Sequence, residues 1–192
     1  MQQSRRNYTL DDYFDVERHS TIKHEYLTGQ IFAMAGASYR HNQIAANLLA
    51  SVGARLRDTP CTVLGSDMRV LTASGLYTYP DVVIVCGAVE LAQHPLDPGE
   101  TLTNPTAIVE ILSRSTGEYD LQEKYDHYRS IPSFRECLFV EQDIVGIERR
   151  WEEGGTWRSE SQSEWKGVIR FHSVAIEVAI SEIYERLLKP SA

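Results

Sequence analysis

The chain has 192 residues, of which 42% are hydrophobic and 24% are charged, and its formal net charge at pH 7 is −8. This length allows one substantial core, and since no Ser-, Gly- or Pro-rich linker interrupts it, we predict a single domain over residues 1–192 with frayed ends at 1–7 and 190–192. The composition excludes extended disorder, no apolar run reaches the roughly 20 residues of a membrane span, and the acidic charge is unlike that of a dedicated nucleic-acid binder.

The three cysteines do not form a recognisable framework. Cys61, Cys86 and Cys137 are an odd set without C-x-x-C spacing, and each lies in an apolar, strand-like context. They are therefore predicted to be buried free thiols in a reducing compartment. Because no charged head followed by an apolar segment opens the chain, we expect a cytoplasmic protein.

The N-terminal half predicts a helix, a hairpin, a second helix and two strands. Residues 8–19 begin with Thr9 followed by Asp12, which resembles a capping box. The dipeptide Thr28–Gly29 between apolar residues is typical of a tight turn. An amphipathic helix over 38–57 follows from apolar residues repeated every four positions. Strands are expected over 61–72 and 76–86.

The C-terminal half alternates a strand, a helix and a meander of strands. A loop over 87–105 leads to a short buried strand over 106–112, and a turn over 113–117 leads to a helix over 118–129 that Pro132 ends. The remaining expected elements are strands at 136–141, 145–151, 157–162 and 168–173 and a helix at 182–188. Together these elements predict an α/β fold with a mixed central sheet.

Two carboxylates interrupt the most apolar strands. Asp81 enters the run YPDVVIV and Glu110 lies within TAIVEIL. A buried unpaired carboxylate costs on the order of several kcal/mol, so these acids must be paired, protonated or bound to metal. Neighbouring strands would place them side by side, and oxygen ligands alone favour Mg²⁺ or Mn²⁺. The backbone carbonyl of Ile111 could add a neutral ligand.

Lys124, on the following helix, is the candidate third member of this site. A lysine beside a dication can orient a water or a scissile phosphate, and burial together with the cation should lower its pKa toward the range of a general base. Asp81, Glu110 and Lys124 then supply the parts needed for metal-assisted hydrolysis of a phosphodiester. The alternative for Lys124 is an ordinary helical pair with Asp120, four positions earlier.

Several segments of the chain resemble those of a known protein family. The segments HEYLTGQIFAMAGASYRH, YPDVVIV, IVEILSRST and D-x-x-x-K-Y-x-x-Y (residues 120–128) are similar to bacterial restriction-endonuclease-like proteins of the PD-(D/E)XK nuclease superfamily. The resemblance implies a restriction-endonuclease-like mixed β-sheet flanked by helices. The sequence departs from the superfamily pattern at Leu112, where a lysine is expected. The resemblance therefore implies that the lysine has moved to position 124. It also implies supporting roles for Glu25 and His41.

The function implied is a Mg²⁺-dependent endonuclease that acts on DNA. Two other functions stay open: a catalytically inactive member of the fold that serves as a binding module, and hydrolysis of another phosphoester. Asp81 and Glu110 could also be paired without chemistry, Glu25 could be a solvated charge and His41 a surface group. A homodimer could supply the missing positive groove by concentrating the following arginines: Arg40, Arg55, Arg57, Arg149 and Arg150.

Overall fold

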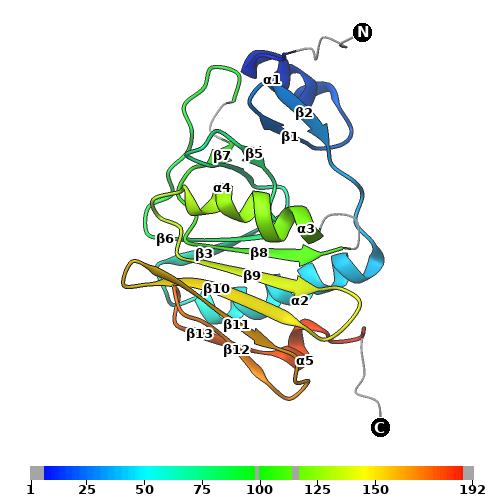
Figure 1. The fold of residues 1–192 in the computed structure, drawn as a ribbon, viewed down its shortest axis with the longest axis vertical. Coiled ribbons are helices and arrows are strands. Elements are labelled where there is room, and N and C mark those ends of the chain that lie inside the picture. Colours follow the sequence, from blue (N-terminus) through cyan, green and yellow to red (C-terminus); the bar gives the residue numbers. More distant parts are fainter. Residues whose placement is uncertain (1–6, 98–99, 114–116, 188–192) are drawn as a thin grey trace.

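A computed structural model describes residues 7–97, 100–113 and 117–187 of the chain, which form two main sheets and several helices (Figure 1). The larger sheet has the strand order β11-β10-β9-β8-β6-β3. Its strands are β3 (Cys61–Gly65), β6 (Val82–Cys86), β8 (Ala107–Leu112), β9 (Glu136–Glu141), β10 (Ile147–Glu153) and β11 (Thr156–Gln162). Strands β8 and β9 are parallel, whereas the other pairs are antiparallel. The predicted mixed sheet is confirmed.

A second sheet has the order β2-β1-β5-β4-β7, and β12 pairs only with β13. These strands are β1 (His24–Leu27), β2 (Gln30–Ala33), β4 (Arg69–Leu71), β5 (Tyr77–Thr78), β7 (Thr101–Leu102), β12 (Val168–Phe171) and β13 (Ile176–Ala179). The helices are α1 (Leu10–His19), α2 (Tyr39–Leu56), α3 (Gly117–Tyr119), the π-helical turn η1 (Asp120–Lys124), α4 (Tyr125–Arg129) and α5 (Ile180–Ile183).

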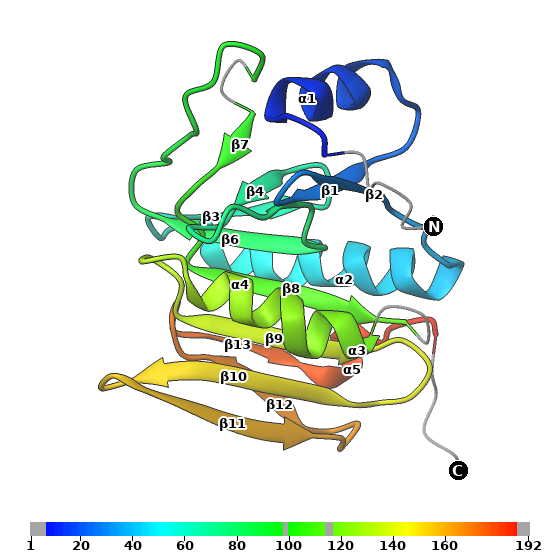
Figure 2. The same cartoon turned by 45° about the horizontal axis from the view of Figure 1, so that its top comes forward.

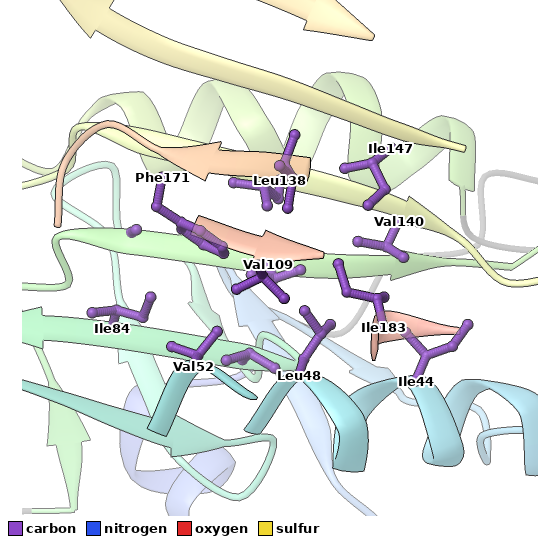
Figure 3. Close-up of a cluster of buried hydrophobic side chains, with 14 of the residues drawn as sticks. Ile44, Leu48, Val52, Ile84, Val109, Leu138, Val140, Ile147, Phe171 and Ile183 are labelled. Atoms are coloured by element: carbon purple, nitrogen blue, oxygen red, sulfur yellow. The ribbon is translucent and has the colours of Figure 1, made fainter. Parts of the chain in front are cut away.

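Helices cover both faces of the larger sheet. Figures 1 and 2 show α2 on one face of β6 and β8, and α3, η1 and α4 on the other. Alternate residues of β8 point to the two sides, because Val109 and Ile111 pack with α2 whereas Ile108 and Leu112 pack with α4. Figure 3 shows the α2 side, where side chains of α2, the sheet and α5 interlock. All six residues of β8 are therefore buried, including Glu110.

Local contacts at the N-terminal end form two helix caps and a tight turn. Thr9 and Asp12 form a capping box at the start of α1, and Ser38 caps α2 by accepting a hydrogen bond from the backbone N–H of His41. The turn between β1 and β2 has positive φ angles of 46° at Thr28 and 83° at Gly29, as a tight hairpin requires.

Two predicted strands each divide between the two sheets. Residues 61–72 form β3 and β4, and residues 76–86 form β5 and β6. Pro80 lies at the second break, where its missing N–H cannot join a ladder. Within the predicted loop, β7 forms by pairing with β4. These strands depend on distant partners, which a local pattern does not reveal.

Near the C-terminus, β13 was not predicted, and the last helix is α5 rather than residues 182–188. Residue 188, most of the predicted turn over 113–117 and the predicted frayed ends, apart from residue 7, lie outside the described residues. Within those residues, no helix has both the length and the apolarity needed to cross a membrane.

The prediction of three free thiols is wrong for two of them. Cys61 on β3 and Cys86 on β6 are directly opposite each other, with Cα atoms 4.0 Å apart, and form a disulfide. Cys137 is buried and free, as expected. The sequence places Cys61 and Cys86 on separate strands, and only the register of β3 against β6 brings them together.

Candidate active site

Asp81 and Glu110 meet where β6 and β8 pair. The register aligns Val82 with Val109, so that Asp81, one residue before β6, lies opposite Glu110. The backbone N–H of Ile111 donates a hydrogen bond of 2.7 Å to Asp81 Oδ2. The expected side-by-side placement of the acids is present.

Glu110 occupies a position that would otherwise hold an apolar side chain. It lies between Ile108 and Leu112 on the face covered by α3, η1 and α4, and is 3% exposed. Burial raises its pKa above the usual value, although the Lys124 ammonium opposes this shift. The Tyr128 hydroxyl donates a hydrogen bond to Glu110 Oε1. Glu110 is therefore a buried carboxyl held by donors from the covering helix.

Lys124 reaches the carboxylates from η1. Its Nζ lies 3.1 Å from Glu110 Oε1, 3.3 Å from Glu25 Oε1 and 3.5 Å from Asp120 Oδ1. The π-helical turn directs both Asp120 and Lys124 inward, an irregularity that is frequent at functional sites. The helical pair with Asp120 therefore exists, but as one contact within a larger cluster.

Without a bound cation, the pKa of Lys124 is raised and not lowered as burial alone would predict. Burial alone would lower it, but the surrounding negative charges, Glu110 foremost, raise the pKa of Lys124 well above its usual value. The side chain is consequently an ammonium ion at neutral pH. In this state it can donate hydrogen bonds and neutralise charge.

Glu25 belongs to the cluster and is not a solvated charge. It lies on β1 and is 7% exposed. The Thr78 hydroxyl donates to its Oε1, and the Tyr119 hydroxyl donates to its Oε2 over 3.1 Å. Strand β1 and the β5–β6 junction therefore fix Glu25 against Lys124, which joins the two sheets at this point.

His41 lies at the more open edge of the cluster. Its Nε2 is 3.1 Å from Asp81 Oδ2, and the side chains of His41 and Asp81 are 17% and 15% exposed, against 5% for Lys124. Solvent therefore reaches the cluster at the His41–Asp81 edge. A hollow of about 230 Å³ lies elsewhere, lined by residues that include Leu112, Leu121 and Phe139. No group of three or more His, Cys, Asp or Glu side chains among the described residues forms a ready-made metal cluster.

The sequence interpretation did not identify three members of the cluster. Thr78, Tyr119 and Tyr128 all donate hydrogen bonds to carboxylates, and Tyr128 is also a core residue. It is fully buried and its hydroxyl reaches Glu110. Tyr128 lies in the segment D-x-x-x-K-Y-x-x-Y that carries the family resemblance, whereas no sequence signal pointed to Thr78 or Tyr119.

Comparisons with known proteins agree with this fold. Two Synechocystis proteins, the uncharacterized proteins sll1609 and slr1290, are each 33% identical over 141 residues. The matches cover 73% and 72% of this chain and 78% and 70% of those proteins. The crystal structure of a putative nuclease belonging to DUF820 from Anabaena variabilis matches with a TM-score of 0.73 at 15% identity, covering 94% of this chain and 99% of that one, which shows a shared fold.

A family model also matches residues 10–181, a range that includes every residue of the cluster described above. The model describes a "Putative restriction endonuclease" family. The chain therefore belongs to the Uma2 family of restriction-endonuclease-like proteins.

Proposed function

We propose that the protein is a Mg²⁺-dependent endonuclease that hydrolyses DNA phosphodiesters at the cluster of Asp81, Glu110 and Lys124. The observation that carries the proposal is the meeting of Lys124 from η1 with Glu110 on β8, where Nζ lies 3.1 Å from Oε1, next to Asp81, which accepts the N–H of Ile111. The nuclease descriptions of the family and of the Anabaena variabilis protein support it. Mn²⁺ would fit the same ligands.

The carboxylates present suit such a cation. The contacts of Asp81 involve Oδ2 and those of Glu110 involve Oε1, so within the described part of the chain Asp81 Oδ1 and Glu110 Oε2 form no hydrogen bond. Mg²⁺ is commonly held by one or two carboxylates together with waters and substrate phosphate oxygens. Asp81 and Glu110 would hold the ion, and the Ile111 carbonyl is the proposed neutral ligand.

When bound, the ion would acidify an attacking water and offset charge on the phosphate. Lys124, held as an ammonium ion by Glu25, Glu110 and Asp120, would donate hydrogen bonds to the scissile phosphate and stabilise its negative charge. His41 is the more exposed neighbour of Asp81 and would orient that carboxylate.

Cleavage of supercoiled plasmid DNA with Mg²⁺, and with EDTA as a blank, tests the proposal. Asp81→Ala and Glu110→Ala should each lower the cleavage rate by about 100-fold or more, because each removes a group that holds charge at the reacting phosphate. Glu123→Ala is the matched control, since Glu123 is an exposed acid on η1. Full activity in the Asp81 and Glu110 variants would refute the assignment.

A catalytically inactive binding module is the second candidate. The charge balance within the cluster favours it, because the Lys124 ammonium already offsets the negative charge of Glu25, Glu110 and Asp120. Isothermal titration separates the two functions. Binding of Mg²⁺ that disappears in Asp81→Asn would contradict a residual, non-functional acidic centre.

A further inference from the structure

Tyr128 is a fully buried residue of α4 whose hydroxyl contacts Glu110, a proposed metal ligand. The hydroxyl donates to Glu110 Oε1, and the same oxygen lies 3.1 Å from Lys124 Nζ. Two donors from one helical segment therefore occupy one oxygen of Glu110. Because the hydroxyl is buried, breaking its bond to Glu110 would leave it without a partner at a cost of about 1 to 3 kcal/mol.

Asp81, like Glu110, receives its donors at one of its two carboxylate oxygens. Its Oδ2 accepts the Ile111 N–H at 2.7 Å and lies 3.1 Å from His41 Nε2. In the part of the chain that the structure describes, Asp81 Oδ1 and Glu110 Oε2 form no hydrogen bond. Each carboxylate is thus held so that a single oxygen is available to a ligand.

Cations differ in how they use carboxylates. Ca²⁺ takes six to eight oxygens in a flexible geometry and often binds a carboxylate through both of its oxygens, whereas Mg²⁺ requires near-octahedral geometry and keeps several waters. Two carboxylates that each offer one oxygen therefore suit Mg²⁺ better than Ca²⁺. Freeing Oε1 of Glu110 would make binding through both oxygens accessible and would reduce this difference.

We propose that Tyr128 is a positioning residue that, together with Lys124, restricts Glu110 to one available oxygen and so makes the site selective for Mg²⁺ over Ca²⁺. This inference rests on the proposed metal site at Asp81 and Glu110. Tyr128 is the informative position because its hydroxyl can be removed while the ring, which lies 5.9 Å from that of Phe134, is kept. Replacing Lys124 would change the charge of the cluster as well.

Isothermal titration of the full chain with Mg²⁺ and, separately, with Ca²⁺ tests this role. Tyr128→Phe should weaken Mg²⁺ binding by about 10-fold, the lower end of the effect of an outer partner of a metal ligand, while Ca²⁺ binding is kept or strengthened. The ratio of the two affinities should therefore fall by about 10-fold. Tyr184→Phe is the matched control, since Tyr184 is also fully buried with a hydrogen-bonded hydroxyl, but bonds to the backbone of Glu141 and Gly146.

The outcomes separate this inference from the proposed function. An unchanged affinity ratio in Tyr128→Phe, with circular dichroism showing a folded protein, would overturn the role of Tyr128 while leaving the metal site in place. An equal fall of the ratio in Tyr184→Phe would also overturn it, because the effect would then be one of general stability. Mg²⁺ binding that persists unchanged in Asp81→Asn would instead refute the metal site itself.

Discussion

Lys124 is the residue on which the charge balance of the cluster depends. It is the ammonium that approaches Glu25, Glu110 and Asp120 in a site where it is 5% exposed. Buried ion pairs are costly to break, because the remaining charge is left without compensation. The same contacts that keep Lys124 protonated therefore make it a structural as well as a functional side chain.

Lys124→Met should lower the free energy of unfolding by about 3 to 5 kcal/mol, because it leaves buried carboxylates without their counter-charge. Urea denaturation at pH 8 measures the loss. Mg²⁺ should restore part of it, since a bound dication replaces the missing positive charge and binds only the folded state. Lys166→Met, at an exposed position, is the control. Equal stability of the two variants would show that Lys124 does not neutralise the cluster.

At the level of elements, the ends of the two helices that flank β13 are tied together. Arg55, near the end of α2, forms an ion pair of 2.8 Å with Glu182 on α5. This contact holds the pKa of Glu182 below its usual value, with the hydrogen bond from Arg55 as the main cause. Since α2 carries His41 to Asp81, the packing of α5 helps to support one side of the site.

The Glu182 contact predicts a pH dependence of stability. A carboxyl whose pKa is lowered by folding contributes stability above its unfolded pKa, and this contribution is lost as the pH falls through the folded pKa. Glu182→Gln should therefore lower the free energy of unfolding by up to about 1 kcal/mol at pH 7, as for other exposed pairs, and by less at acid pH. Urea denaturation at several pH values measures this, with Glu123→Gln as control. A difference from wild type that grows toward acid pH would contradict the prediction.

For the whole molecule, charge is the feature that fits DNA least. The net charge is −8, and several arginines that could have formed a positive groove are engaged within the chain. Arg149 is 3% exposed and pairs with Glu160, Arg150 pairs with Glu148, and Arg55 pairs with Glu182. A groove built by a homodimer would therefore have to rely on other arginines, and this assembly stays a prediction.

The Cys61–Cys86 disulfide ties the edge strand β3 to β6, the strand that follows Asp81. Because the bond closes a loop between residues 25 positions apart, reduction should lower the free energy of unfolding by about 3 kcal/mol. Urea denaturation with and without a reductant measures this. The reductant should have no effect on Cys61→Ser.

A thiol count provides the second readout for the disulfide. In denaturant without a reductant, one thiol per chain should react, that of Cys137, and three should react after reduction. Three reactive thiols before reduction would show that the disulfide is absent from the isolated protein.

Elements whose signals are local could be predicted from the sequence. The capping box of α1, the helical repeat of α2, the Thr28–Gly29 turn and the apolar run of β8 all depend on neighbours in the chain, and all were predicted. Asp81 and Glu110 could also be identified as candidate site residues, because each is a charged residue in an apolar strand and a buried charge requires a partner.

The partners of those charges could be identified only from the three-dimensional fold. The split of 61–72 and 76–86 between two sheets, the disulfide and the hydrogen bonds of Thr78 and Tyr119 to Glu25 join residues far apart in the chain. The protonation of Lys124 was decided in the same way. Burial and negative neighbours shift a lysine pKa in opposite directions, and only the fold brings Glu25, Glu110 and Asp120 together around Lys124 so that their charges outweigh its burial.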